Sequence, residues 1–515
     1  MICRIRSAGL IGIEAVSVDV EVDGARTSAD EPSFITVGLP DKSVNESRER
    51  VRAAIENSGY DNPFMRITVN LAPADLKKEG PAYDLPIAIG LMTVNHQVDP
   101  NNVTRYAMIG ELALDGRVRR VAGVLPVALE LKKRNVKTLI VPDENAAEAA
   151  VVDGIDIIPV GHLREVVAFI NGTQAIEPFR ADMQKYFVEA DHYGVDFSEV
   201  KGQEAAKRAL IIAAAGGHNL LMLGNPGVGK SMLSKRLPTI LPRMTLPEAL
   251  ETTKIYSVAG LVTRDMPLIT QRPFRSPHHT VSDAGMIGGG TNPRPGEISL
   301  AHNGVLFLDE LPEFNRKTLE VMRQPLEDGT VTISRAVGSL TFPAKLMMIA
   351  AMNPCPCGYL GHPTKRCTDS SRQVAAYRSR ISGPMLDRID IHLEVPAVDI
   401  KELSGGRKGL SSAEMSGQVQ AARDRQLERF KRAARAGLYN NAGMNEKELA
   451  EYAVLKPEVK TLLDGAMESL QLSARAYTRI RKIARTIADL DAKAEIEPDH
   501  ITEAINYRTL DRGER

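Results

Sequence analysis

The sequence predicts a multidomain α/β protein with a nucleotide-binding loop near its middle. Three observations support this fold class. A glycine-rich loop at 224–231 follows an apolar run, a second apolar run ends in two acids at 309–310, and residues 415–512 follow a mainly helical pattern. The 515 residues are enough for about two to four domains of roughly 100–200 residues each.

Composition and charge exclude several classes of protein. Hydrophobic residues make up 43% and charged residues 25% of the chain, which is the balance of a soluble globular protein. The chain has no run of about 18 apolar residues and no signal-peptide pattern, so we expect no membrane contact and a cytoplasmic location. The formal net charge of zero argues against a protein that coats nucleic acid, but a local basic channel remains compatible with it.

The chain divides by pattern into four regions. In the first, "GIEAVSVDVEV" alternates like a strand, and "SVNESRERVRAAIENSG" is typical of a helix that ends at Gly59. In the last, Ile480, Ile483, Ile487 and Leu490 recur at helical spacing. The predicted regions are a mixed α/β domain, a polar linker, a P-loop core and a helical C-terminal domain, at 1–170, 171–195, 196–400 and 401–515.

A phosphate-binding loop is predicted where the apolar strand "NLLML" leads into the helix-forming stretch "SMLSKRL". The pattern Gly-x4-Gly-Lys-Ser between them is the P-loop signature in its expected strand–loop–helix context. Its glycines let backbone N–H groups surround phosphate oxygens, Lys230 reaches the β- and γ-phosphates, and Ser231 ligates Mg²⁺. We expect ATP and Mg²⁺ as cofactors, and the loop residues are Gly224, Asn225, Pro226, Gly227, Val228, Gly229, Lys230 and Ser231.

Two acids and an amide are predicted to complete the nucleotide site. The strand in "GVLFLDEL" delivers Asp309 and Glu310 to its carboxyl end, where parallel sheets bind their ligands. Asp309 would hold Mg²⁺ through water, and Glu310 would orient or deprotonate the attacking water. A third strand, "KLMMIAAMN", ends at Asn353, whose amide is suited to position the same water.

Longer stretches resemble a known family. The order of these motifs resembles the AAA+ ATPases, and "RPFRSPHHTVSDAGMIGGG", "VMRQPLEDGTVTISRA" and "AAMNPCPCGYLGHP" resemble the magnesium-chelatase-like branch and, within it, the ComM/YifB family. The resemblance covers nearly the whole chain. It implies a hexameric ring ATPase that acts as a DNA helicase and promotes branch migration during natural transformation.

The resemblance also implies roles for residues outside the P-loop. Val200, Gly202 and Gln203, in "VKGQ", match the segment that flanks adenine, and Asn353 matches the sensor 1 residue.

Three arginines match positions that act on the γ-phosphate in this class. Arg388, in "MLDRID", is the first candidate for the arginine finger supplied by a neighbouring subunit, and Arg380 is the second. Arg475, in "LSARAYTRI", matches the sensor 2 arginine. A guanidinium stabilises the charge that develops on the transferred phosphoryl group. The alternative for each arginine is a surface or ion-pair role.

The N-terminal region resembles the Lon-protease-like domain in "LAPADLKKEGPAYDLPIAIGLM" and "IGELALDGRVRRVAGVLPVALELKKRNVKTLIVPDENAAE". Lon proteases use a serine that an adjacent lysine activates. Here Ala82 stands at the serine position and Leu125 at the lysine position, although Lys77 and Lys78 lie near the former. We therefore expect no proteolysis, and instead a role in oligomerisation, substrate contact or structure alone.

A cysteine cluster predicts a metal site. "CPCGYLGHPTKRC" offers Cys355, Cys357, His362 and Cys367 within 13 residues, a plausible tetrahedral zinc set of the structural kind. Asp369 is the alternative ligand, and a reduced loop with incidental cysteines is the alternative interpretation.

Two inserts carry basic residues that a ring could direct at DNA. The first contains Arg272, Arg275, His278, His279 and Arg294, and ring ATPases of the branch that this chain resembles place hairpins facing the pore at this point. The second, "TVTISRAVGSLTFPAK", predicts a hairpin with a Gly338-Ser339 turn, and it carries Arg335 and Lys345. Repeated around a ring, such charges would create positive potential in a channel. The alternative is that they pair with acids or bind nucleotide.

Three functions compete at this point. The first is a DNA-translocating ring helicase with DNA and its own copies as partners. The second is the ATPase subunit of a magnesium or cobalt chelatase, which the Lon-like region does not suit. The third is a MoxR-like chaperone that remodels proteins.

Overall fold

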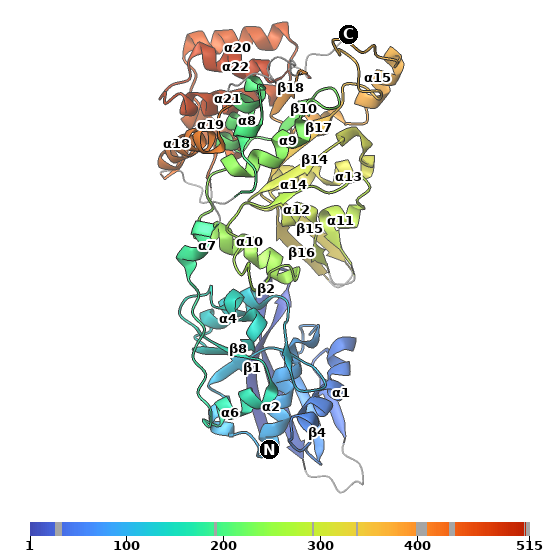
Figure 1. The fold of residues 1–515 in the computed structure, drawn as a ribbon, viewed down its shortest axis with the longest axis vertical. Coiled ribbons are helices and arrows are strands. Elements are labelled where there is room, and N and C mark those ends of the chain that lie inside the picture. The colour runs from blue at the N-terminus through green and yellow to red at the C-terminus, as the bar shows by residue number, and fades with distance from the viewer. Residues whose placement is uncertain are drawn as a thin grey trace. The chain divides into compact units, whose positions relative to one another are not determined.

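The computed structural model describes residues 1–25, 33–189, 193–290, 293–335, 338–397, 409–431, 438–508 and 510. The chain divides into two compact units (Figure 1). One unit comprises Met1–Val188 and Leu246–Ile269, and the other comprises Glu189–Thr245 and Thr270–Arg515. Among the described residues, no helix combines the length and the apolar character needed to cross a membrane.

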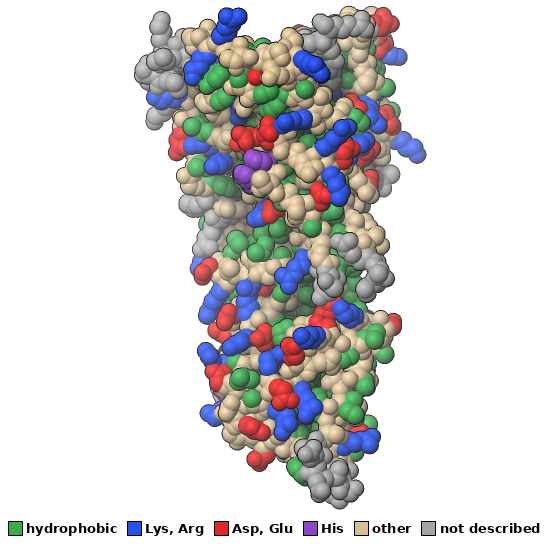
Figure 2. All heavy atoms as spheres, turned by 90° about the vertical axis from the view of Figure 1, so that its right-hand side faces the viewer, with side chains coloured by type: hydrophobic (Ala, Val, Ile, Leu, Met, Phe, Trp, Pro, Cys, Tyr) green, Lys and Arg blue, Asp and Glu red, His purple; other side chains and the backbone are tan. Residues whose placement is uncertain are grey.

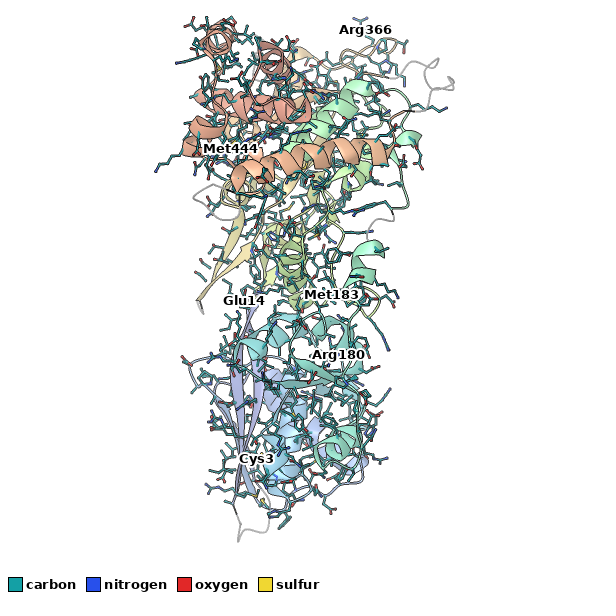
Figure 3. The ribbon with its side chains drawn as sticks, turned by 90° about the vertical axis from the view of Figure 1, so that its left-hand side faces the viewer. Cys3, Glu14, Arg180, Met183, Arg366 and Met444 are labelled. Carbon is teal, nitrogen blue, oxygen red and sulfur yellow. The ribbon has the colours of Figure 1, made fainter. Side chains whose placement is uncertain are left out.

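A mixed seven-stranded sheet in the order β3-β4-β2-β1-β5-β8-β9 forms the frame of the N-terminal unit. β1 and β2 pair as a long antiparallel ribbon in which Val18, Val20 and Val22 are buried at every second position. Cys3 and Glu14 lie toward opposite ends of the ribbon (Figure 3). The strands are β1 (Ile2–Ile11), β2 (Glu14–Ala25), β3 (Phe34–Val37), β4 (Arg66–Ala72), β5 (Tyr106–Met108), β8 (Thr138–Pro142) and β9 (Asp156–Val160), with a separate ribbon of β6 (Glu111–Leu112) and β7 (Val118–Arg119).

Helices of this unit bury their apolar stripes in its core. The Asp41 carboxylate accepts a hydrogen bond from the Val44 backbone N–H at 2.8 Å and so caps α1, which ends close to the predicted Gly59. α2 is buried along its whole length, as the apolar run that makes up most of its sequence predicts. The helices are α1 (Lys42–Asn57), α2 (Asp84–Val94), α3 (Pro100–Val103), α4 (Val124–Lys133), α5 (Ala146–Ala149) and α6 (Leu163–Ile170).

Residues 246–269 belong to the N-terminal unit, although the sequence analysis assigned them to the P-loop core. They contain α10 (Leu246–Val258), whose Ser257 hydroxyl donates to the buried carboxylate of Glu148. Lys254 on the same helix forms an ion pair with Glu14 at 2.9 Å. These contacts join segments far apart in the chain, which sequence pattern alone does not reveal. The polar stretch 171–195 also differs from expectation, because it contains α7 (Met183–Glu189).

The second unit contains a five-stranded parallel sheet in the order β11-β14-β17-β10-β18. Every residue of β10, β14 and β17 is buried, so these strands appear in the sequence as continuous apolar runs. The strands are β10 (Leu220–Leu223), β11 (Phe274–Arg275), β14 (Val305–Leu308), β17 (Met347–Met352) and β18 (Ile391–Glu394). Two ribbons lie outside the sheet: β12 (Gly288–Gly289) with β13 (Arg294–Pro295), and β15 (Thr330–Arg335) with β16 (Gly338–Pro343).

Short helices connect these strands, and a helical bundle follows them. Figure 1 shows the bundle beside α8 and the β10 and β18 edge of the sheet. Ile480, Ile483 and Ile487 of α21 are fully buried in a core shared with α8, which confirms the predicted helical stripe. The helices are α8 (Glu204–Gly216), α9 (Lys230–Arg236), α11 (Asp283–Ile287), α12 (Glu297–Leu300), α13 (Arg316–Val321), α14 (Arg323–Asp328), α15 (Ser371–Arg378), α16 (Gly383–Leu386), α18 (Ser412–Phe430), α19 (Glu446–Tyr452), α20 (Pro457–Ser469), α21 (Ala474–Leu490) and α22 (Pro498–Asn506).

A buried charged cluster joins the bundle to β18. Arg479 of α21 forms an ion pair with buried Asp390 at 2.5 Å. Buried Arg508 donates to the Asp390 carbonyl at 3.1 Å. His392, two residues along, is also buried, and its pKa is lowered to about 3 because burial and the Arg508 guanidinium both disfavour the imidazolium.

We expect this histidine to make stability depend on pH. The unfolded chain protonates His392 below an ordinary pKa of 6.5, whereas the folded chain leaves it neutral until about pH 3. Folding stability should therefore fall as the pH drops from about 6.5, by about 1.4 kcal/mol per pH unit for this one proton. Urea unfolding between pH 7 and pH 5 measures the slope. His392→Gln should reduce it by one proton, and equal slopes would contradict the assignment.

Candidate active site

The parallel sheet brings the predicted nucleotide-site residues to one edge. β10, β17 and β14 are neighbours with matched directions, so the segments after their carboxyl ends lie side by side. The P-loop follows β10, Asn353 follows β17, and Asp309 with Glu310 follows β14. Ligands bind at this edge in parallel α/β sheets.

Backbone conformation in the P-loop depends on glycine at two positions. Gly227 and Gly229 have φ angles of 84° and 95°, a region that residues with a Cβ rarely adopt. A Cβ added at either position would meet no atom within 4 Å, so the requirement at both is conformational and not one of space. α9 starts at the next residue, Lys230, so the loop ends at a helix N-terminus. The free backbone N–H groups there are suited to bind phosphate.

The Lys230 ammonium lies at the centre of the site. It donates to the Gly224 carbonyl at 2.5 Å, to the Asn225 carbonyl at 3.1 Å and to Asn353 Oδ1 at 3.1 Å. Burial lowers its pKa from the ordinary value, while Asp309 and Glu310 act in the opposite direction. A partly desolvated cation among carbonyl oxygens is suited to bind phosphate oxygens.

Oxygen donors suited to Mg²⁺ lie beside this lysine. Ser231 Oγ donates to Asp309 Oδ2 at 2.7 Å, so the hydroxyl and the carboxylate are held together. Mg²⁺ prefers hydroxyl, carboxylate and phosphate oxygens, and the pair offers the first two of these. The donor set therefore fits the expected ion.

Glu310 has a strained backbone and a neighbour that the sequence analysis assigned elsewhere. Its φ is 54°, a region uncommon for residues other than glycine, and such strain is frequent at functional sites. Its Oε2 lies 3.6 Å from His279 Nδ1. From the sequence, His279 was expected on a DNA-facing insert, but β11, which precedes it, is paired with β14, and so His279 lies beside Glu310.

The predicted adenine-flanking segment contacts the P-loop. Val200 is buried, and Gly202 and Gln203 both have positive φ angles, of 63° and 59°. The Gln203 side-chain amide donates to the Pro396 carbonyl at 2.8 Å and to the Val228 carbonyl at 3.3 Å. The Gln203 side chain therefore joins this segment to the P-loop at Val228.

Arg388 is held by contacts within its own chain. Its Nε donates to the Arg323 carbonyl at 3.0 Å and its Nη1 to the Pro384 carbonyl at 2.7 Å, and its Nη2 pairs with Glu327. The side chain is 13% exposed. A finger for a neighbouring subunit needs a guanidinium that projects outward, so Arg388 would have to leave Glu327 to act as one.

The other two arginines project further. Arg380 is 54% exposed and pairs with Glu313 at 2.9 Å. Arg475, at the start of α21, is 63% exposed and pairs with Asp387 at 2.8 Å. Exposed ion pairs of this kind break at little energetic cost, so neither guanidinium is held as firmly by its acid as a buried one would be.

Some basic side chains of the two inserts are paired within the fold, and others are exposed. Arg272 donates to three backbone carbonyls, and Arg275 makes two hydrogen bonds of 2.7 Å to Glu297, so both serve the fold. Arg294 and Lys345 are exposed. The side chain of Arg335 lies outside the described residues.

The predicted second hairpin is present but its turn differs from expectation. Gly338 and Ser339 lie within β16 and pair with Arg335 and Ser334, so they do not form the turn. Residues 336–337, between the two strands, lie outside the described residues. The predicted position of the turn was therefore wrong. Gly-Ser is a weak turn signal, and both residues pair within the hairpin instead.

The positions that match the protease dyad carry no nucleophile–base pair. Ala82 lies in the short helix Pro81–Tyr83, and Leu125 is buried in α4. Of the nearby lysines, Lys77 pairs with Glu79 at 2.8 Å, and buried Lys78 donates to the Pro73 carbonyl.

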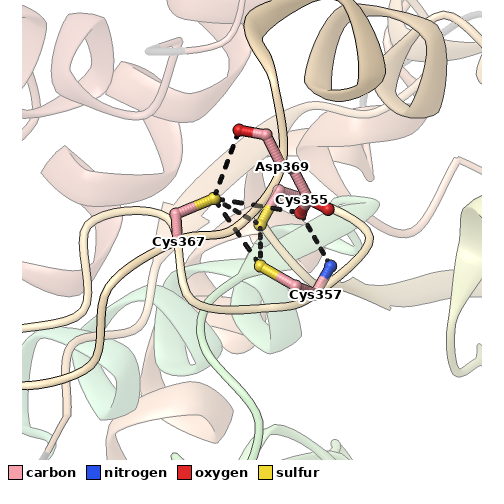
Figure 4. Close-up of side chains that lie close together, drawn as sticks. All are labelled: Cys355, Cys357, Cys367 and Asp369. Atoms are coloured by element: carbon pink, nitrogen blue, oxygen red, sulfur yellow. Dashed lines mark hydrogen bonds between the residues drawn. The ribbon is translucent and has the colours of Figure 1, made fainter.

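The cysteine cluster forms, with a different fourth ligand from the one first predicted. The Sγ atoms of Cys355, Cys357 and Cys367 and a carboxylate oxygen of Asp369 all lie within 4.8 Å of one another (Figure 4). His362 is not among them, because its Nδ1 accepts backbone N–H groups of its own turn, including that of Lys365 at 3.0 Å. Asp369, the alternative ligand, takes its place.

A parallel sheet with a P-loop, an acid pair and a polar asparagine at successive strand ends defines a P-loop ATPase of the AAA+ class. Family models agree: "Magnesium chelatase, subunit ChlI" matches residues 196–403, "Subunit ChlI of Mg-chelatase" matches 20–145, and "Magnesium chelatase, subunit ChlI C-terminal" matches 409–508.

Full-length relatives define the family. The chain is 44% identical to YifB of Salmonella typhimurium strain LT2 over 99% of this chain and 97% of the relative. It is also 44% identical to "Competence protein ComM" of Haemophilus influenzae over 98% of this chain and 97% of the relative. The chain therefore belongs to the YifB/ComM family of magnesium-chelatase-like AAA+ ATPases. A partial match, 29% identical over 29% of the chain, is to Lon protease 2 of Bacillus subtilis.

Two substitutions should separate binding from hydrolysis. Lys230→Ala removes the central cation and should abolish tight ATP binding. Glu310→Gln keeps the shape of the side chain but removes the carboxylate that is expected to activate water, so the variant should retain ATP while turnover stops. Equilibrium binding of a fluorescent ATP analogue and steady-state phosphate release measure the two properties. Normal turnover by Glu310→Gln would show that another group activates the water.

Proposed function

We propose that the protein is an ATP-driven, ring-forming DNA translocase, a helicase that promotes branch migration of recombining DNA. The observation that carries the proposal is the identity to a competence protein along nearly the whole chain. A further match, 28% identical over 30% of the chain, is to "DNA replication licensing factor mcm7" of Schizosaccharomyces pombe. The ATP site described above supplies the energy that such movement requires.

The hydrolytic step uses groups at the sheet edge. Lys230 and the P-loop N–H groups bind the β- and γ-phosphates, and Mg²⁺, held through Ser231 and Asp309, would neutralise their charge. Glu310 accepts the proton of the attacking water, and Asn353 positions that water or the γ-phosphate. Arg475 of the same chain approaches the γ-phosphate from the helical bundle.

DNA contact is proposed for the two ribbons that lie outside the sheet. Arg294, on β13, is exposed, and so is Lys345, two residues after the end of β16. On the face in Figure 2, basic and acidic side chains are intermixed and form no continuous basic band. A positive channel would therefore arise only when assembly, proposed as a hexamer, repeats these few cations around a pore. The N-terminal unit is proposed to contribute to assembly or DNA contact and not to proteolysis.

An ATPase subunit of a metal chelatase is the second candidate, since all three family models carry that description. Such a subunit would hydrolyse ATP without response to DNA. ATP hydrolysis measured with and without DNA separates both this candidate and a protein-remodelling chaperone from the proposed function.

Forked and single-stranded DNA should increase the rate of ATP hydrolysis, and the protein should displace strands or move branch points only with hydrolysable ATP. Phosphate release with and without DNA, and a fluorescent strand-displacement assay, test this. Lys345→Ala with Arg294→Ala should weaken DNA binding and flatten its salt dependence, while Lys460→Ala on α20 serves as the control. ATP turnover that ignores every DNA offered would refute the proposal.

Arg388 is proposed as the arginine finger, with Arg380 as its competitor. Arg388→Ala should leave ATP binding nearly unchanged and reduce turnover of the assembled ring by about 10³-fold or more. Arg380→Ala, measured beside it under identical assembly, is the matched comparison. If Arg388→Ala hydrolyses ATP normally and Arg380→Ala does not, the finger is Arg380.

A further inference from the structure

The three thiols of the cysteine cluster have the spacing of metal ligands. Cys355 Sγ lies 3.4 Å from Cys357 Sγ and 3.6 Å from Cys367 Sγ, and the last two sulfurs are 3.6 Å apart. Sulfurs that share one tetrahedral zinc ion at a Zn–S distance of about 2.3 Å are separated by about 3.8 Å. The cluster therefore needs little rearrangement to accept such an ion.

The carboxylate completes the set from the opposite side of the loop. An oxygen of Asp369 lies 3.8 Å from Cys367 Sγ and accepts the Cys357 backbone N–H at 2.8 Å. That hydrogen bond fixes the carboxylate next to the sulfurs, as outer contacts orient ligands in metal sites. Three soft thiolates with one carboxylate favour Zn²⁺ over Mg²⁺ or Ca²⁺, and four protein ligands leave no open position for catalysis.

The ligand loop rests directly on the P-loop. The Asn225 side-chain amide donates to the Gly358 carbonyl at 2.6 Å and to the Leu360 carbonyl at 3.3 Å. Gly358 approaches Pro226 so closely that a Cβ there would lie 2.6 Å from the proline ring. Two residues of the phosphate-binding loop are thus positioned by a segment between the first and last cysteines.

The same loop continues from the strand that carries the sensor amide. Asn353, which contacts Lys230, precedes Cys355 by two residues. No helix or strand occurs between Asn353 and α15, so only turn hydrogen bonds, such as that from the Gly358 N–H to the Cys355 carbonyl at 3.0 Å, and side-chain contacts hold this stretch in place. An ion that ties residue 355 to residue 369 would remove much of its conformational freedom.

We propose that Cys355, Cys357, Cys367 and Asp369 bind one structural zinc ion, and that the bound ion holds the 354–360 segment against the P-loop, so that zinc occupancy sets the affinity for ATP. The inference rests on the ATP site and not on the DNA substrate. A protein whose ATPase does not respond to DNA can therefore still show zinc-dependent ATP binding. A protein whose ATPase is stimulated by DNA can still lack it.

Metal analysis of the full-length protein, purified without added metal, tests the site. We expect about one zinc per chain. Cys367→Ser and Asp369→Ala should lose the metal, while His362→Ala, a change in the same loop outside the cluster, should keep it. Absence of zinc, iron in its place, or loss of zinc on His362→Ala with retention on Asp369→Ala would overturn the ligand set.

Nucleotide binding tests the connection and does not depend on the folding of any variant. Zinc is stripped from the wild-type protein with a thiol reagent and chelator, then restored after reduction, while binding of a fluorescent ATP analogue is followed. Removal should weaken binding about tenfold, the scale of one lost hydrogen bond, and zinc should restore it. Asn225→Ala, which removes the hydrogen bonds but leaves the Pro226 contact, should keep zinc and show a smaller loss of ATP affinity on zinc removal than the wild-type protein; an equal or larger loss would show that these hydrogen bonds do not carry the connection. An affinity that ignores zinc in the wild-type protein would refute the connection.

Discussion

Parallel pairing of β10 with β17 is the constraint on which the ATP site depends. The pairing runs from Leu220 with Ile349 to Leu223 with Met352, so both strands end at the same level. The Gly224 N–H then donates to the Met352 carbonyl at 3.2 Å, and the chains diverge into the P-loop and the asparagine segment. A shift of the register would separate Lys230 from Asn353, and no local feature of either segment could restore their contact.

Some groups at this edge are held rigidly, and others are exposed and more weakly held. The P-loop, Ser231 and Asp309 are joined by short hydrogen bonds on a buried sheet, so the phosphate and metal positions are set before nucleotide arrives. Glu310 and Arg475 are exposed and have weak ion-pair partners. This division suits an ATPase, because nucleotide binding needs a rigid cradle and the hydrolytic step needs groups that can move.

The cysteine loop adds a second support under the same cradle. Asn225 and Pro226 contact the loop at Gly358, and the thiol cluster joins the two ends of the loop. A metal clip can stabilise this segment without an apolar core, since the stretch has few buried side chains of its own. The energetic link between metal and nucleotide follows from contact alone and needs no large movement.

The sequence by itself determined the P-loop, the acid pair, Asn353 and the helical C-terminal stripe, because each rests on local spacing and on short apolar runs. The AAA+ class was indicated by the resemblance of these motifs to a known family. Tertiary structure decided what depends on distant segments. It placed residues 246–269 with the N-terminal unit, brought His279 to Glu310, exchanged His362 for Asp369, and enclosed Arg388 in contacts of its own chain. Spacing along a chain fixes which residues share a turn or strand end, whereas strand order and packing fix which of them meet.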